Sequence, residues 1–117
     1  RNVALRRGEE PRLCVYDWEL ASFAPPQRDV CEFLAYALPP GTPRATRDAF
    51  IEGYRQDLER ASGRTFARAS FLATYRLSAL DFALTRLGVL SVAHGFKSYD
   101  FLPRVLASHF EYLDECW

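Results

Sequence analysis

Asn2 and Asp17 are the two residues whose types and positions best suit a metal site. Asp17 directly follows the apolar run 13–16, which has the character of a strand, at the point where a loop begins. Asn2 comes just before an earlier strand-like run, 3–7, and the strands of a hairpin are antiparallel, so we expect the two residues to be neighbours. Amide and carboxylate oxygens suit Mg²⁺ that bridges phosphates. Taken alone, Asp17 also fits a residue that caps the following turn.

The elements that must position this pair are a hairpin and about four helices. Residues 3–17 predict the hairpin, with a turn at 8–11 and a second strand apolar enough to be buried on both faces. Prolines, glycines and apolar stripes then predict four helices. The first helix begins after Pro25-Pro26, has Asp29 in its first turn and stops at 39–41. The second helix runs from Thr42-Pro43 to Gly63. The third helix runs from about 65 to 93, and the fourth begins at Asp100. The expected fold class is mainly α with a short β-hairpin.

The order and spacing of several residues resemble one enzyme family. The segment Arg1-Asn2-Val3-Ala4-Leu5 is followed by the predicted hairpin, then by Asp17-Trp18-Glu19, and Asp29 stands twelve residues after Asp17. This pattern resembles the aminoglycoside phosphotransferase and choline kinase family, a branch of the protein-kinase-like fold. In that resemblance Asn2 matches the Asn that closes the family's catalytic loop, and Asp17 matches its metal-binding Asp. Glu19 belongs to the common Trp-Glu that follows, and Asp29 matches an Asp that supports the catalytic loop.

The resemblance implies the C-terminal lobe of a kinase-like phosphotransferase. Such an enzyme transfers a phosphoryl group from ATP or GTP to a small-molecule hydroxyl, with Mg²⁺ as cofactor. The resemblance is specific over 1–38, whereas 39–117 shares only a helical pattern. The family's catalytic Asp and its N-terminal nucleotide-binding lobe would lie upstream of Arg1. We therefore expect 1–117 to be one partial domain, inactive alone, with the missing lobe as its partner. The alternative is a non-catalytic, kinase-like binding module.

Asp81 is a further candidate, on the third predicted helix. At about 100° per residue, Arg68 and Arg86 share one face, and Asp81 points about 140° away among small polar residues. One interpretation makes Asp81 the wall of a substrate cleft that receives a cation or hydroxyl. The other makes it a residue that is hydrogen-bonded to a neighbouring helix or loop. Under both we expect it to be mostly buried with a partner. His94 and His109 have no metal-site spacing and are expected at caps or on the surface.

Composition excludes several function classes. The chain has 117 residues, 49% of them apolar and 26% charged, and its 15 basic and 15 acidic side chains cancel. This balance argues against a nucleic-acid-binding face and against a polybasic membrane anchor. The longest apolar stretch is interrupted by Arg76, Asp81 and Arg86, so no transmembrane helix is expected. The 3 cysteines do not form a disulfide framework, and reduced, buried thiols in a cytoplasmic protein are expected.

Overall fold

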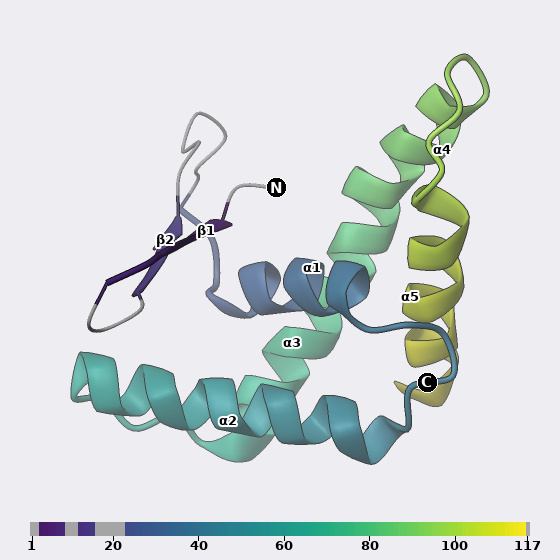
Figure 1. Ribbon diagram of the computed structural model, residues 1–117. Coiled ribbons are helices and arrows are strands. Elements are labelled where there is room, and N and C mark those ends of the chain that lie inside the picture. Colours follow the sequence, from purple (N-terminus) through teal and green to yellow (C-terminus); the bar gives the residue numbers. More distant parts are fainter. Residues whose placement is uncertain (1–2, 9–11, 16–22, 117) are drawn as a thin grey trace.

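The computed structural model describes residues 3–8, 12–15 and 23–116, and most of these residues are helical. The elements in chain order are β1 (Val3–Arg6), β2 (Arg12–Val15), α1 (Gln27–Ala37), α2 (Arg44–Ser62), α3 (Arg68–Phe82), the π-helix η1 (Ala83–Leu87), α4 (Gly88–His94) and α5 (Leu102–Cys116) (Figure 1). The mainly α fold class is thereby confirmed.

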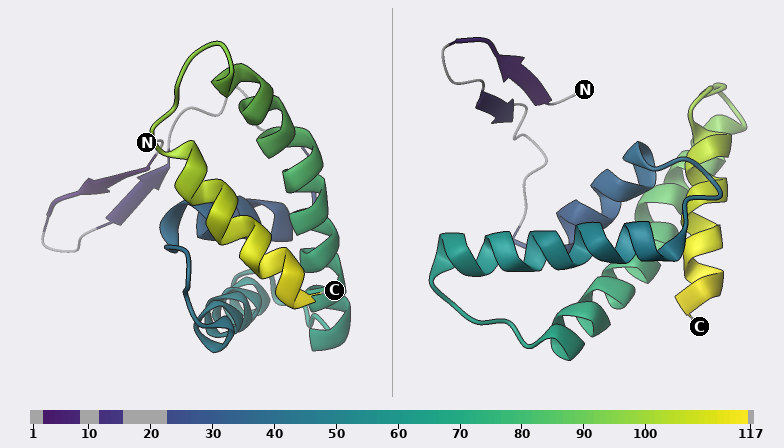
Figure 2. Two further views of the ribbon diagram at one scale, coloured as in Figure 1. Left: turned by 90° about the vertical axis from the view of Figure 1, so that its right-hand side faces the viewer. Right: turned by 60° about the horizontal axis from the view of Figure 1, so that its bottom comes forward.

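The predicted hairpin is present as an antiparallel strand pair. Val3 pairs with Val15 and Leu5 with Leu13. The expectation that the second strand is buried on both faces was wrong, because Cys14 is exposed. The hairpin stands apart from the helices (Figures 1 and 2).

The ends of α1 and α2 follow from local backbone chemistry. α1 begins after the two prolines and ends where Leu38 becomes extended, as the residue before a proline tends to be. α2 ends at Gly63, whose φ of +67° is left-handed and favours glycine, and whose N–H donates to the carbonyl of Glu59. The sequence predicts Thr42 as the N-cap of α2, but that prediction was wrong. Pro43 occupies the N-cap position, and the Thr42 hydroxyl donates to Pro39 O instead.

The hydrophobic core lies where α1 and α5 pack on α3, with α2 closing one side (Figures 1 and 2). α1 crosses in front of α3, and α5 runs back alongside it. Each helix contributes the apolar side of its own stripe, as expected for amphipathic helices. The buried apolar residues are Val30, Cys31, Leu34, Ala35, Ile51, Phe71, Tyr75, Ala79, Phe82, Ala83, Leu87, Leu102, Val105, Tyr112 and Leu113.

α3, η1 and α4 form one continuous rod where a single helix was predicted. Within η1 the N–H of Gly88 donates to the carbonyl of Ala83, five residues back, so the turn holds about one extra residue. Contrary to expectation, the rod Arg68–His94 is long and apolar enough to cross a membrane by length and composition, and only 28% of its most apolar window is buried. One such helix is weak evidence for a membrane protein, because the core helix of a soluble protein passes the same test.

Candidate functional site

The predicted metal ligands Asn2 and Asp17, and the supporting Glu19, lie outside the described residues. Their proposed roles therefore stay predictions. Within the described ranges 3–8, 12–15 and 23–116, no group of three or more His, Cys, Asp or Glu side chains could hold a metal ion. The structure does describe the elements that flank these three residues in the chain, namely the hairpin strands and the first turn of α1.

Asp29 lies in the first turn of α1 and is exposed, and its supporting role stays a prediction. It does not accept a capping hydrogen bond, since α1 has no side-chain cap at its start. A favourable interaction with the positive end of the helix dipole remains. The start of α1 is held from α2, because the Tyr54 hydroxyl donates to Pro26 O at 3.3 Å. Burial, and then the charge of Asp29, raise the pKa of that tyrosine.

Asp81 is not buried, contrary to the prediction. Its side chain is 46% exposed, and its Oδ2 lies 3.5 Å from Nη2 of Arg28 on α1. The predicted partner therefore exists, but it is a cation on a neighbouring helix rather than a cleft ligand. This contact favours the interpretation in which Asp81 ties helices together over the one in which it lines a substrate cleft.

Arg86 also faces α1, where its Nε lies 3.8 Å from Oε1 of Glu32. A uniform 100° per residue would place Asp81 and Arg86 on different sides of the helix, but the i→i+5 pattern of η1 brings residues five apart toward one side. Arg28 and Glu32 are four apart on α1 and so share a face. Two ion pairs therefore join α1 to α3 and η1. In the first pair the cation is on α1, and in the second pair the anion is on α1.

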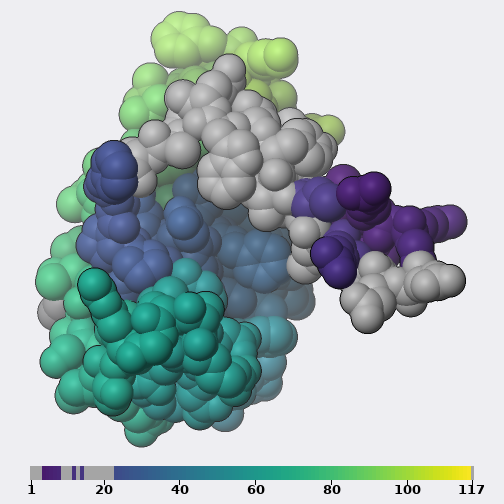
Figure 3. Space-filling model, turned by 90° about the vertical axis from the view of Figure 1, so that its left-hand side faces the viewer, coloured from purple at the N-terminus to yellow at the C-terminus, as the bar shows by residue number. Residues whose placement is uncertain are grey.

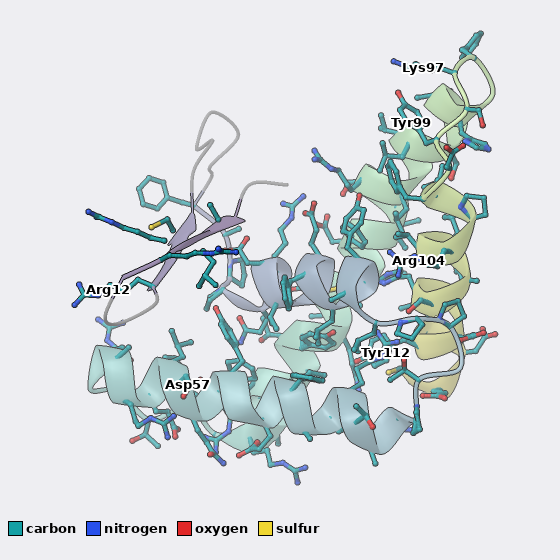
Figure 4. All side chains as sticks on the ribbon, viewed as in Figure 1. Arg12, Asp57, Lys97, Tyr99, Arg104 and Tyr112 are labelled. Atoms are coloured by element: carbon teal, nitrogen blue, oxygen red, sulfur yellow. The ribbon has the colours of Figure 1, made fainter. Side chains whose placement is uncertain are left out.

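An open apolar groove lies between α1 and α2, and the surfaces of these two helices adjoin on the side shown in Figure 3. Its volume is about 300 Å³, and a neighbouring hollow of about 540 Å³ continues it along α2. Phe33 and Phe50 are both largely exposed there, and the carboxylate of Asp57 at its edge pairs with Arg60. Figure 4 shows Asp57 on α2. The groove can hold an apolar surface, but it brings no nucleophile or base together.

Arg47 is a buried arginine that sequence reasoning missed. Its Nη2 lies 3.3 Å from the carbonyl oxygen of Ser108 and 3.4 Å from that residue's hydroxyl. Its guanidinium carbon lies 4.9 Å from the centre of the Tyr112 ring, and Nε has no partner. In the described part of the chain no carboxylate pairs with Arg47, so neutral groups stabilise this cation. The signal was available, since Arg47 extends the apolar stripe of Ile51 and Tyr54 by one turn.

Two titratable groups near Arg47, namely Cys31 and His109, are held in their neutral forms. Burial raises the pKa of the Cys31 thiol to about 12, so it is not a thiolate nucleophile at neutral pH. Burial lowers the pKa of His109, and its Nε2 lies 2.9 Å from the carbonyl oxygen of Ala79. The expectation of a cap or surface role is therefore wrong for His109. It is confirmed for His94, whose Nδ1 accepts the N–H of Tyr99 at the end of α4.

Comparisons with protein-family models, curated proteins and solved structures found no match to this chain.

Proposed function

We propose that this chain is the C-terminal part of an ATP- or GTP-dependent phosphotransferase that acts on a small-molecule hydroxyl. Asn2 and Asp17 offer an amide and a carboxylate oxygen, the hard donors that fit Mg²⁺ held against phosphates. The bound ion would neutralise charge on the transferring phosphoryl group. Glu19 and Asp29 support the site, and the catalytic base belongs to the upstream part of the protein.

The observation that carries this proposal is the hairpin between the two candidate ligands. Val3, which directly follows Asn2, pairs with Val15, which lies two positions before Asp17. A strand pair at this place is what the resemblance implies between the end of the catalytic loop and the metal-binding Asp. The exposed Asp29 in the first turn of the next helix gives further support.

The test is a phosphotransfer assay on the complete gene product. ATP and GTP are each offered with aminoglycosides, macrolides, choline and homoserine as acceptors, with and without Mg²⁺. Asp17→Asn is expected to lower turnover by about 10²-fold or more, because charge neutralisation supplies much of the catalysis. Asp57→Asn, a matched change at an exposed carboxylate on α2, should leave turnover intact. Full activity of Asp17→Asn would reject the proposal. The 117-residue chain alone should show neither phosphotransfer nor tight Mg²⁺-dependent ATP binding.

A second candidate is a non-catalytic, kinase-like binding module, which the open groove between α1 and α2 favours. The two candidates differ in the residues just upstream. A His-x-Asp ending five residues before Asn2 supports the enzyme, whereas a different residue at that Asp position, together with no turnover for any acceptor, supports the module.

A further inference from the structure

An uncharged apolar strip runs along the outward side of the α3–η1–α4 rod. Its large side chains are 39% exposed at Leu80, 71% at Leu84 and 90% at Phe96, and α4 contributes no buried residue. We define the outer strip as Leu77, Leu80, Leu84, Val89, Val92 and Phe96. The apolar content of this rod is therefore only partly used by the core beneath it.

The π-helix brings the members of the outer strip onto one line. In a regular α-helix Val89 and Val92 would lie about 120° and 60° around the axis from Leu77. The extra residue in η1 turns everything after it back by roughly 100°, which returns both valines, and Phe96 beyond them, to the side of Leu77 and Leu84. A helical irregularity that aligns six exposed apolar residues points to an interaction surface.

The exposed area of the outer strip is large for a monomer. The exposed fractions of its six side chains correspond to roughly 600–800 Å², taking ~150–200 Å² for a whole large apolar side chain. The largest apolar patch on a typical monomer is about 300–600 Å², and each side of a standard interface buries about 800 Å². The strip therefore supplies about half of one standard interface, and two copies of it supply both halves.

The strip is also complementary to itself in size. When two rods are antiparallel with Leu84 at the two-fold axis, the extra residue in η1 puts Leu80 level with Gly88 and Val89. Leu77 then faces Val92. The exposed Ala73 faces Phe96, the one-residue difference in spacing being taken up by the wider turn of η1. Apolar residues thus meet apolar residues along the seam, and the two small residues Gly88 and Ala73 leave room for Leu80 and Phe96.

Among the described residues, no neighbour requires glycine at position 88. Its φ is −58°, an ordinary helical value, and a Cβ there would come no closer than 3.7 Å to Ala83 O. A glycine in a helix interior costs about 1 kcal/mol relative to alanine. Close approach of a side chain from a second molecule accounts for it.

The distribution of charge is compatible with a second copy as the occupant. The strip itself carries no charge, and beside it Asp81 and Arg86 pair with α1 of their own chain. Two-fold pairing therefore opposes no like charges along the seam. We propose that the outer strip is a self-association surface, on which a second copy of this chain packs its own strip antiparallel across Leu84. This inference is independent of the proposed function.

Sedimentation velocity of the 117-residue chain, from about 1 to 100 μM, tests the proposal. A reversible dimer is expected. Leu84→Glu places two carboxylates at the axis and should weaken the dimer by at least ~100-fold, while circular dichroism stays unchanged because Leu84 is exposed. Phe50→Glu is the matched control, since Phe50 is exposed on α2 outside the strip, and it should leave the dimer intact.

A size exchange tests the antiparallel register. Gly88→Leu should weaken the dimer, and adding Leu80→Ala should restore it, because large and small side chains are then simply exchanged. A monomer at every concentration, or a dimer indifferent to Leu84→Glu, overturns the proposal. Strip-dependent binding to vesicles of phosphatidylcholine and phosphatidylserine would also overturn it, with a lipid surface as the occupant. So would a longer gene product that is monomeric and loses thermal stability with Leu84→Glu, because its own chain then covers the strip.

Discussion

α3 and α4 belong to one rod but differ completely in burial. α3 buries Phe71, Tyr75, Ser78, Ala79 and Phe82, whereas α4, with its sequence GVLSVAH, buries none of its residues. The difference lies in the neighbours, since α1 and α5 pack on α3, while α4 extends beyond α1 and contacts only one end of α5 (Figure 2). Apolar content alone therefore does not make a helix part of the core, because neighbouring helices must also pack on it.

The largest expected effect is a difference between α3 and α4 in the free energy of unfolding that a truncated side chain costs. Phe82→Ala should cost about 3–5 kcal/mol in the free energy of unfolding, because it leaves a cavity under α1 and α5. Val92→Ala should cost less than about 0.5 kcal/mol, because its side chain is exposed. Urea unfolding in a Leu84→Glu background removes the contribution of association. Equal losses for the two variants would mean that α4 is covered in solution.

Arg47 allows a comparison between a buried cation and an exposed one. Arg47→Ala should cost about 2–4 kcal/mol, since it removes a buried stem and the contacts to Ser108 and Tyr112. Arg47→Met should restore most of that loss, because an apolar side chain of similar size avoids burying a charge. Arg44→Ala, the exposed control, should cost less than about 1 kcal/mol. A Met variant as unstable as the Ala variant would show that the charge itself holds the core.

Cys31 and Cys14 should differ in their response to pH. Because the pKa of Cys31 is raised from 9.0 to about 12 by burial, the folded chain keeps a proton that the unfolded chain loses. Its contribution to stability is complete below pH 9 and is lost as the pH rises toward 12. Thiol alkylation at pH 8 should modify the exposed Cys14 rapidly and Cys31 only upon unfolding. Equal alkylation rates in the native protein would contradict the buried position of Cys31.

The smallest expected effect concerns the ion pairs that join α1 to the rod. A double-mutant cycle with Arg28→Ala and Asp81→Ala should give a coupling of about 0–1 kcal/mol that decreases with added salt. The same cycle on Glu32 and Arg86 should give a similar value. Coupling that is unchanged in 1 M salt would indicate a pair more buried than its exposure implies.

Much of the architecture follows from local sequence signals. The hairpin, the stop before Pro39 and the left-handed end at Gly63 were all predictable, because proline restricts the backbone and glycine permits left-handed conformations regardless of context. The first-turn position of Asp29 was predictable for the same reason. These features need no knowledge of what packs on them.

The side-chain environments were less predictable because they depend on the other helices. A π-turn has no strong local signature, so a uniform helical period placed Asp81 and Arg86 on different sides and predicted burial for Asp81. His109 was expected at the surface, yet the core around Ala79 accepts it through one hydrogen bond. The candidate ligands Asn2 and Asp17 rest on sequence alone, since both lie outside the described residues.

The position of α5 in the chain has a consequence for biosynthesis. α5 supplies the carbonyl and the ring that surround the guanidinium of Arg47, and Figure 4 shows Tyr112 on its inner side. α1, α2 and α3 leave the ribosome earlier, so during translation Arg47 stays hydrated and the surface of Tyr75 stays uncovered until α5 arrives. Until α5 has been made, α1, α2 and α3 therefore stay in an open, chaperone-accessible form, and the core closes when α5 packs on them.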